Sequence, residues 1–329
     1  MKLIITGATG FIGRNFAEFF STQGYDVLAT GRSVEIGNEI SEIGIPYRQI
    51  EITDRNQVLE NFKKADCVIH CAGQAGDWGK YKEFYNVNVT GTKNVIDACI
   101  KYGIQKIIFI STPSIYYNGQ NRFNVKESDP LPDRQFKYGK TKLLAEEKLL
   151  ESQIRGIQSI IFRPRAVYGK YDRIIVPRIL KMAEGKHLPL INNGEAKVDI
   201  TYIGNLNHAL HCALKSDSDA WNQVYNISNG CPISVKDWFK TLLEVFEREF
   251  NAKSVPLSKA MKSASLMQIM NVIAFGSLKP TLTKFSVGYM GSTLTMSVEK
   301  AKELLGYEPQ YTNRAGFDEY KNFYKSLNN

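Results

Sequence analysis

Tyr138 and Lys142 stand four residues apart in a segment whose pattern predicts a helix. Positions i and i+4 lie on one face of a helix, so the phenol and the ammonium are expected to point at the same place. A cation beside a phenol favours the phenolate, and we therefore expect Lys142 to lower the pKa of Tyr138 from about 10 toward neutrality. Such a phenol can exchange a proton with an alcohol or a ketone. Beside a nicotinamide, the pair predicts hydride-transfer chemistry, although the same spacing alone is equally typical of solvated helix residues.

A glycine-rich turn near the amino terminus supplies a second element of the site. Gly7, Gly10 and Gly13 fall where a predicted strand meets a predicted helix. Glycines at such a turn let the backbone approach a pyrophosphate, whose charge the amino terminus of the helix stabilises. Their spacing is G-x-x-G-x-x-G, which departs from the G-x-G-x-x-G fingerprint. The residues predicted to hold the phosphates are Gly7, Thr9, Gly10, Phe11, Ile12 and Gly13.

The type of cofactor is predicted from the residues that follow the second strand. An acidic side chain there hydrogen-bonds a ribose 2′-hydroxyl, whereas an arginine suits a 2′-phosphate. Residues 30–33 read Thr-Gly-Arg-Ser and contain no carboxylate. We therefore expect NADP(H), with Arg32 and Ser33 on the 2′-phosphate and with Glu51 and Ile52 beside the adenine. The alternative is that Arg32 is an ordinary surface arginine.

Hydroxyl side chains follow a predicted buried strand over residues 106–111. Ser111, Thr112 and Ser114 come at its carboxyl end, which is the edge of a parallel sheet where ligands bind. A hydroxyl bonded to the substrate oxygen, with Tyr138 as acid/base and Lys142 beneath it, forms a consistent catalytic group. The order of glycine turn, hydroxyl run and Tyr–Lys pair along the chain argues against a merely solvated Tyr–Lys pair.

The elements that must position these residues alternate between strand and helix over the first half of the chain. This alternation predicts an α/β fold with a Rossmann-type, doubly wound parallel sheet. Beyond residue 168 the alternation weakens, which favours a smaller α/β substrate domain interleaved with the first. We divide the chain into an NADP-binding domain over residues 1–167 and a substrate domain over 168–329. The predicted strands cover residues 2–6, 26–30, 45–52, 67–71, 106–111, 157–163, 197–202 and 222–227, and the predicted helices cover 11–23, 55–63, 86–102, 138–153, 176–184, 205–215 and 235–250.

Together these segments resemble the extended short-chain dehydrogenase/reductase family, which includes NAD-dependent epimerases and dehydratases. The similarity lies at residues 6–13, 70–73, 88–92, 111–112, 138–142 and 163–169, and it extends over essentially the whole chain. The resemblance implies that Thr112 polarises a carbonyl, that Tyr138 is the acid/base and that Lys142 also holds the nicotinamide ribose. The further residues that it implies for the cofactor cleft are Ala72, Gly73, Asn88, Pro164, Arg165 and Ala166.

Other segments resemble one branch of that family, the 3β-hydroxysteroid and sterol-carboxylate dehydrogenases with the bacterial 2-alkyl-3-oxoalkanoate reductases of olefin biosynthesis. They cover residues 72–79, 110–114, 163–178, 193–202 and 227–230. The resemblance implies an enzyme of lipid metabolism that reduces a hydrophobic 3-oxo acid, such as a 2-alkyl-3-oxoalkanoate, with NADPH. Gln74, Trp78, Ser114 and Arg165 are expected to contact the substrate, with Arg165 on the carboxylate. Trp78 either covers the nicotinamide and the substrate chain or anchors its loop.

The segment over residues 255–290 is rich in Met, Leu, Ile and Phe. Methionine side chains adapt to irregular apolar ligands. Residues 264–275 are too few to span a bilayer, so the segment is a lid over an acyl pocket, part of the core of the second domain, or a membrane-contacting element. A nucleotide-sugar enzyme would instead need polar and basic residues here to grip a diphosphate.

Three other functions share some of these motifs. A 3β-hydroxysteroid or sterol-4-carboxylate dehydrogenase has the same catalytic group, but Arg32 favours NADP and therefore reduction. A nucleotide-sugar epimerase or dehydratase is disfavoured by the apolar segment. A non-catalytic NADP-binding regulator would have no need of Thr112, Tyr138 and Lys142.

Composition narrows the partners and the compartment. The 329 residues carry a formal net charge of +9 without a dense Lys/Arg run, which disfavours nucleic acid and favours anionic ligands or a membrane surface. We expect a cytoplasmic homodimer without a signal peptide, and a peripheral contact with a membrane or a multienzyme assembly stays open. The five cysteines are expected to be reduced, and His208 and His211 lack a third ligand, so no metal site is predicted.

Overall fold

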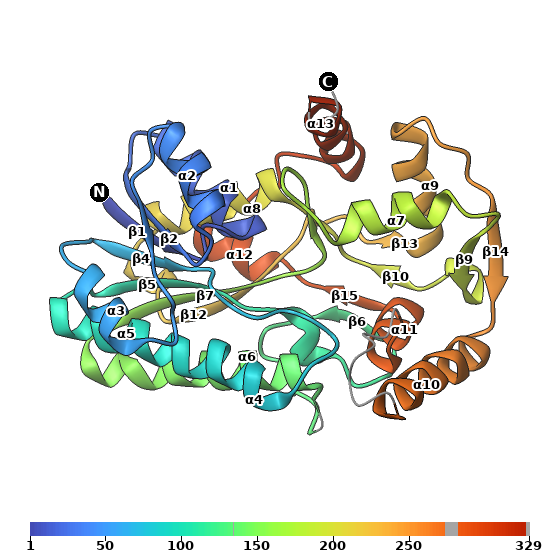
Figure 1. Ribbon diagram of the computed structural model, residues 1–329, viewed down its shortest axis with the longest axis horizontal. Helices are drawn as coiled ribbons and strands as arrows, with labels where there is room; N and C mark the ends of the chain where they lie inside the picture. Colours follow the sequence, from blue (N-terminus) through green and yellow to red (C-terminus); the bar gives the residue numbers. More distant parts are fainter. Residues whose placement is uncertain (134, 274–281, 327–329) are drawn as a thin grey trace.

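The computed structural model describes residues 1–133, 135–273 and 282–326. Seven parallel strands form the central sheet in the order β12-β7-β5-β4-β1-β2-β3 (Figure 1). The chain changes direction across the sheet between β1 and β4, which is the point where doubly wound folds bind ligands. The Rossmann-type fold is therefore as predicted. Its strands are β1 (Lys2–Thr6), β2 (Asp26–Gly31), β3 (Tyr47–Gln49), β4 (Cys67–His70), β5 (Lys106–Ile110), β7 (Gln158–Pro164) and β12 (Gln223–Ile227).

Helices cover both faces of this sheet, because its strands are apolar on both sides (Figure 1). Phe16, Leu206 and Ala301 belong to the core on one face, which α1, α8 and α12 cover. Val58, Val95 and Leu149 belong to the core on the other face, beneath α3, α5 and α6. The bounds are α1 (Phe11–Thr22), α2 (Val34–Glu42), α3 (Arg55–Asn61), α4 (Tyr81–Tyr85), a π-helix η1 (Asn86–Thr90), α5 (Gly91–Tyr102), α6 (Lys137–Glu151), η3 (Ser152–Arg155), α8 (Ile203–Lys215), η5 (Ser218–Ala220) and α12 (Glu299–Leu305).

A second, four-stranded sheet has the order β13-β10-β15-β6. Its strand β6 comes from the first half of the chain, whereas β12 of the central sheet comes from the second half. The two halves are therefore interleaved, and the boundary at residue 167 stays a prediction. The strands are β6 (Arg122–Val125), β10 (Lys197–Val198), β13 (Ile233–Ser234) and β15 (Leu294–Met296), and the two further pairs are β8 (Val167–Tyr168) with β11 (Thr201–Tyr202) and β9 (Leu188–Ile191) with β14 (Ala252–Val255).

The remaining helices enclose the second half of the molecule. Trp238, Phe239 and Phe317 belong to its core. A smaller cluster around Ala264 and Val287 joins α10 to α11. The bounds are η2 (Pro113–Tyr116), α7 (Ile175–Ala183), η4 (Asn192–Gly194), α9 (Val235–Val245), α10 (Leu257–Ile273), α11 (Lys284–Gly291) and α13 (Asn313–Ser326).

The structure corrects several predicted elements. The strand predicted over 45–52 is limited to Tyr47–Gln49, since only three residues pair with β2. The helix predicted over 235–250 ends at Val245, because Glu247 has a left-handed φ of 56° that no α-helix continues. Residues 255–290 form α10 and α11, and residues 274–281, including Phe275, lie outside the described part of the chain.

His70 ties three of these elements together beneath the ligand-binding edge. Thr6 accepts the Ala72 amide at 3.1 Å and donates its own proton to Nδ1 of His70, 2.7 Å away. Thr92 donates to the Asn88 carbonyl at 2.6 Å and therefore accepts from Nε2 of His70 at 3.0 Å. The imidazole is buried and neutral, since burial first and the charge of Lys142 second lower its pKa to about 3.

This neutral histidine predicts acid sensitivity of the fold. Between about pH 3 and pH 6.5 the unfolded chain binds a proton at this position that the folded chain refuses, so stability falls as the pH falls through that window. The contribution approaches about 1.4 kcal/mol per pH unit. Urea titrations at several pH values should give a shallower acid slope for His70→Gln than for the wild type. The exposed His187→Gln is the control, and equal slopes in all three proteins would contradict the assignment.

Candidate active site

The glycine turn between β1 and α1 is closed by backbone contacts. Gly7 has a φ of 69°, and a Cβ there would lie 2.7 Å from the Ala72 nitrogen. A Cβ at Gly13 would overlap the Gly7 carbonyl. Gly10 is the cap residue before α1 and has no side chain, so it offers no acceptor to the first backbone amides of the helix. The turn therefore offers a glycine cradle and a helix amino terminus, as an anionic phosphate requires.

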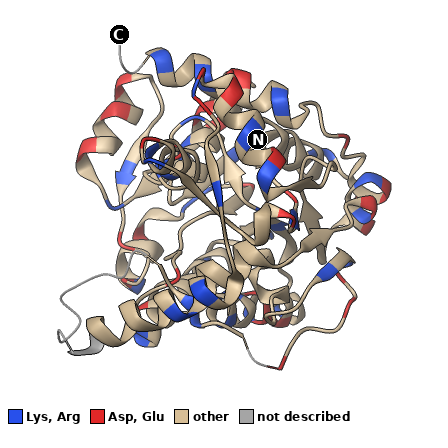
Figure 2. Ribbon diagram, turned by 90° about the vertical axis from the view of Figure 1, so that its right-hand side faces the viewer, with Lys and Arg blue, Asp and Glu red and all other residues tan. Residues whose placement is uncertain are grey.

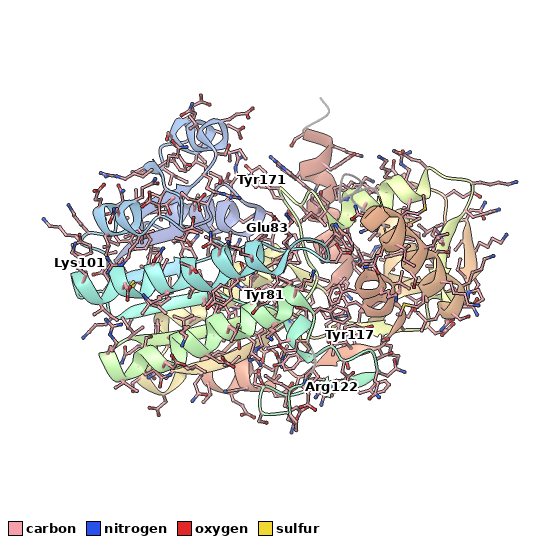
Figure 3. All side chains as sticks on the ribbon, turned by 60° about the horizontal axis from the view of Figure 1, so that its bottom comes forward. Tyr81, Glu83, Lys101, Tyr117, Arg122 and Tyr171 are labelled. Carbon is pink, nitrogen blue, oxygen red and sulfur yellow. The ribbon has the colours of Figure 1, made fainter. Side chains whose placement is uncertain are left out.

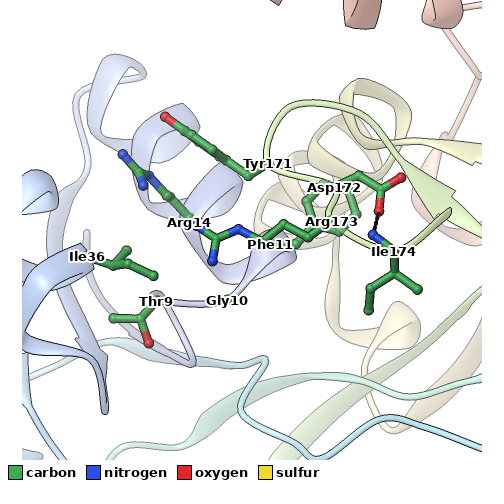
Figure 4. Close-up of a pocket in the computed structure, with 9 residues that line it drawn as sticks. All are labelled: Thr9, Gly10, Phe11, Arg14, Ile36, Tyr171, Asp172, Arg173 and Ile174. Carbon is green, nitrogen blue, oxygen red and sulfur yellow. Dashed lines mark hydrogen bonds between the residues drawn. The ribbon is translucent and has the colours of Figure 1, made fainter. Parts of the chain in front are cut away.

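A pocket of about 170 Å³ lies against this turn (Figure 4). Thr9, Gly10 and Phe11 line one side of it, and the loop after β8 lines the other. In that loop, Arg173 extends toward the turn (Figure 4). Arg14 is already paired with Glu39 at 2.6 Å. Sequence analysis missed Arg173, because an exposed arginine in a loop carries no recognisable sequence signal.

A second pocket of about 380 Å³ lies at the end of β2. Arg32 lines it and is 71% exposed, with its Nη1 only 3.8 Å from a carboxylate oxygen of Glu51. Ser33 caps α2 by accepting the Ile36 amide at 3.3 Å. Ile52 follows Glu51, which also lines this pocket, and its side chain is buried beneath Gly91. An exposed ion pair of this kind contributes little, so a phosphate can compete for Arg32.

The loop after β4 is held by the amide of Asn88, which lies in the π-helix η1. Its Oδ1 accepts a hydrogen bond from the Gln74 backbone amide at 2.8 Å. Its Nδ2 donates to the Gln74 carbonyl at 3.1 Å and to the Thr141 hydroxyl at 3.0 Å. Asn88 thereby fixes the loop to the catalytic helix α6. A Cβ at Gly73 in this loop would lie 3.8 Å from Nζ of Lys142. Contacts of Ala72, Gly73 and Asn88 with a cofactor stay predictions.

The hydroxyl run after β5 lies directly against α6. Thr112 donates to Ser114 at 3.1 Å and shares a hydrogen bond with Tyr138. Gly139 permits this approach, because a Cβ there would already lie 3.3 Å from Ser114. The structure therefore brings the predicted Thr112, Ser114 and Tyr138 together.

The predicted effect of Lys142 on Tyr138 is wrong for this structure. Burial raises the pKa of Tyr138 to about 12, and the hydrogen bond with Thr112 opposes this only in part. Nζ of Lys142 instead donates to the Ile110 carbonyl at 2.7 Å and lies 3.7 Å from the centre of the Phe109 ring. Burial lowers the pKa of Lys142 to about 7, while the carboxylate of Glu146 acts in the opposite direction. The sequence spacing correctly predicted that Tyr138 and Lys142 share one face of the helix. It did not predict that this face is buried.

A buried ion pair anchors α6 beneath the catalytic residues. Glu146 accepts from Nε of Arg163 at 3.1 Å, from Nη2 of the same residue, and from the Ser111 hydroxyl. Nη1 of Arg163 donates to Tyr116 at 2.5 Å, and Tyr116 donates to Asn226 at 2.9 Å. The network joins α6 to β5, β7 and β12. Sequence analysis missed Glu146, although its place four residues after Lys142 was a usable signal.

Arg165 is 1% exposed, yet its Nε and Nη1 have no hydrogen-bond partner among the described residues. Its guanidinium carbon lies 4.2 Å from the ring centre of Tyr289, with which it also shares a hydrogen bond. Asp199 acts on it electrostatically, but the carboxylate accepts from Ser228 and from the Met296 amide. Two donor nitrogens of a buried guanidinium, which together carry three N–H groups, are therefore left unused.

The backbone around Arg165 is fixed by its neighbours. Thr201 donates to the Arg165 carbonyl at 2.7 Å, and the Arg165 amide donates to Ile227 at 3.3 Å. Ala166 follows with a left-handed φ of 45°, a conformation that costs energy in a non-glycine residue. Pro164 ends β7 immediately before this turn. Arg165 therefore lies in a fixed turn directly after β7.

Aromatic rings form an apolar wall next to Tyr138. Tyr117, Phe136, Phe285 and Tyr289 pack on one another with ring centres 4.6 to 5.7 Å apart. Tyr117 lies where the first half of the chain meets the carboxyl-terminal helices (Figure 3). Tyr289 acts electrostatically on Tyr138 and shares a hydrogen bond with Arg165, so both residues lie near it. Sequence analysis had named residues 255–290 as apolar but missed the role of Tyr117 and Phe136.

Trp78 is half-buried in the loop between Gly76 and Gly79, both of which have positive φ values. The neighbouring Asp77 accepts from the Thr283 hydroxyl at 2.8 Å. This bond ties the loop after β4 to the start of α11. Whether Trp78 or Gln74 contacts a substrate stays a prediction.

Comparisons with known proteins show the family of the chain. The model of the NAD dependent epimerase/dehydratase family matches residues 3–228. The chain therefore belongs to that family, and it is an NAD(P)-dependent oxidoreductase of the extended short-chain dehydrogenase/reductase type.

Individual relatives cover nearly the whole chain. A 2-alkyl-3-oxoalkanoate reductase of Stenotrophomonas maltophilia is 30% identical over 327 residues, which is 98% of each chain. A 3beta-hydroxysteroid-dehydrogenase/decarboxylase of Arabidopsis thaliana is 30% identical over 93% of this chain and 75% of its own length. The structure of a UDP-glucose 4-epimerase of Thermotoga maritima superposes with a TM-score of 0.80 at 22% identity and covers 100% of both chains, which supports the fold alone.

The described residues fit a nicotinamide dinucleotide. The glycine cradle and the start of α1 suit its pyrophosphate, and the pocket at Arg32 suits its adenosine end. Lys142 of α6 reaches the same edge of the sheet, because it donates to the carbonyl of Ile110 at the end of β5.

The buried ion pair predicts the cost of disturbing α6. Glu146→Gln removes the charge that compensates Arg163, and we expect it to lower the free energy of unfolding by roughly 3–5 kcal/mol. The exposed neighbour Glu147→Gln should change it by less than about 0.5 kcal/mol. Urea denaturation of the three proteins measures both. Equal stability of the two variants would show that the pair does not hold the helix.

Proposed function

We propose that the protein is an NADPH-dependent reductase of hydrophobic 3-oxo acids, such as 2-alkyl-3-oxoalkanoates, and that it forms the 3-hydroxy acids. The observation that carries this proposal is Arg165, a buried guanidinium with two unused donor nitrogens that shares the neighbour Tyr289 with Tyr138. Leaving donors of a buried cation unpaired is costly, so a ligand carboxylate that accepts from them gains a strong, charge-assisted contact.

The chemistry of a 3-oxo acid matches the arrangement of the polar groups. One carbon separates its ketone from its carboxylate, so both groups of a single molecule must be recognised close together. Thr112 and Tyr138 supply hydroxyls for the ketone oxygen, and Arg165 supplies the cation for the carboxylate. Tyr289 is near both Tyr138 and Arg165. A substrate that lacks the carboxylate would leave Arg165 unsatisfied.

The aromatic wall supports a hydrophobic substituent on that acid. Tyr117, Phe136, Phe285 and Tyr289 present rings rather than charged groups next to Tyr138. Burial of an alkyl chain against rings is favourable in proportion to the apolar area removed from water. A sugar diphosphate would find no compensation for its charge on these four side chains.

Tyr138 is in the correct protonation state for a reduction. NADPH, when bound, supplies the hydride that the carbonyl carbon receives. With a pKa raised to about 12, the Tyr138 phenol carries its proton at neutral pH and donates it to the oxygen that becomes the hydroxyl. Thr112 positions the Tyr138 hydroxyl through their shared hydrogen bond.

Arg32 supports NADPH over NADH. It is the exposed cation in the pocket at the end of β2, and no carboxylate follows it directly in the sequence. The neighbouring Glu51 holds it only loosely, at 3.8 Å.

Replacement of Arg32 should alter the affinity for one cofactor alone. Arg32→Gln removes a charge-assisted contact with the 2′-phosphate, so the Kd for NADPH should rise roughly 10- to 100-fold while that for NADH stays nearly constant. Arg48→Gln, at an exposed arginine of the neighbouring strand β3, is the control. Calorimetric titration measures all four affinities, and an equal loss for both cofactors would refute the 2′-phosphate contact.

Replacement of Arg165 tests the proposed substrate class. In Arg165→Leu, kcat/KM for a long-chain 2-alkyl-3-oxo acid should fall on the order of 10²-fold or more, whereas that for its methyl ester should change little. Arg165→Lys, which keeps the charge, should recover part of the activity with the acid. Tyr138→Phe is the comparison, because loss of the proton donor should lower turnover of acid and ester alike. An Arg165→Leu enzyme that still prefers the acid would refute the assignment.

A further inference from the structure

The sequence contains a long basic segment without acidic residues. No Asp or Glu occurs between Glu249 and Glu299. The lysines in the same interval are Lys253, Lys259, Lys262, Lys279 and Lys284. Since Asp and Glu make up 33 of the 329 residues, their absence here gives this part of the surface a distinctly positive charge. Helix α10 lies within the segment and carries Lys but neither Asp nor Glu along its length (Figure 2).

One face of α10 combines two lysines with large apolar side chains. Lys259, Lys262, Leu266, Ile269 and Met270 follow a spacing of three, four, three and one, which places them on one side of a helix. All five are exposed, and Leu266, Ile269 and Met270 are exposed by 60%, 56% and 53%. We call these five residues the α10 face. Three adjacent aliphatic side chains this exposed are unusual on the surface of a water-soluble monomer.

The opposite side of α10 is already used for packing. Ala260 and Ala264 are buried against Val287 of α11. The α10 face therefore points away from the molecule, at the edge where α10 and α11 lie side by side (Figure 1). The same α11 contributes Phe285 and Tyr289 to the aromatic wall at the active site.

We propose that the α10 face docks on the surface of a membrane that contains anionic phospholipids. Leu266, Ile269 and Met270 enter the boundary between headgroups and acyl chains, and Lys259 and Lys262 contact lipid phosphates. No helix among the described residues is long and apolar enough to cross a bilayer. A protein partner with an acidic rim or a second copy of this chain are the other candidate occupants, but a second copy would bring the same lysines into repulsion.

Vesicle sedimentation tests the proposal with the full chain and without substrate or cofactor, so its outcome is independent of the proposed reaction. The wild type should pellet with vesicles of phosphatidylcholine and phosphatidylglycerol, and far less with phosphatidylcholine alone. Leu266→Glu should lower the partition coefficient about tenfold or more, because a carboxylate replaces an inserted side chain. Ile154→Glu is the matched control, since Ile154 is 93% exposed at the far end of α6.

The lysines are tested in the same way. The double variant K259Q/K262Q should lower binding to the anionic vesicles about tenfold or more, and raised salt should have the same effect. The control K63Q/K101Q removes equal charge from exposed positions outside the α10 face. Equal binding by Leu266→Glu and Ile154→Glu, or no binding by the wild type, would overturn the proposal. A wild-type dimer that Leu266→Glu converts to a monomer, without vesicle binding, would overturn it in favour of self-association.

Discussion

The catalytic arrangement depends on the buried ion pair between Arg163 and Glu146. It holds α6 against the sheet at the level where Ser111 follows β5 and β7 approaches its turn. Removing two charges from water is expensive, and the cost is offset here because the Glu146 oxygens and all three guanidinium nitrogens of Arg163 have partners. An apolar pair could fill the same volume but would not fix the rotation of α6. That rotation decides where Tyr138 and Lys142 point.

Arg163 and Arg165 show how the same side chain serves two purposes two residues apart. Arg163 is fully paired and therefore structural. Arg165 lies beyond Pro164, at the left-handed Ala166, and keeps two donors unused although it is almost completely buried. An interior normally satisfies such groups, so this exception, which shares the neighbour Tyr289 with the proposed acid/base Tyr138, points to a ligand that completes the set. Arg165 suits a ligand with one carboxylate, and the aromatic wall suits a long apolar part of the same ligand. Docking of the α10 face on a membrane, as proposed, agrees with such an apolar ligand.

Much of the fold was predictable from the sequence because it rests on local patterns. The glycine turn, the alternation of strands and helices, and the Tyr138–Lys142 spacing each arise from a few neighbouring residues. The direction in which the pKa of Tyr138 shifts was not predictable. It depends on burial near α11 and the Phe84 ring, which are distant in sequence. Tyr116 and Tyr289 were missed for the same reason. The interleaving of β6 and β12 depends on pairings between strands that are far apart along the chain.

The most direct test of the proposed substrate class is the rate of NADPH consumption by the wild-type enzyme. A long-chain 2-alkyl-3-oxo acid should be compared with the corresponding ketone that lacks the carboxylate and with UDP-glucose. If Arg165 and Tyr138 recognise one molecule together, the acid is reduced far faster than the ketone, and UDP-glucose neither reacts nor inhibits. Equal rates for acid and ketone, or inhibition by the sugar nucleotide, would contradict that pairing and the substrate class inferred from it.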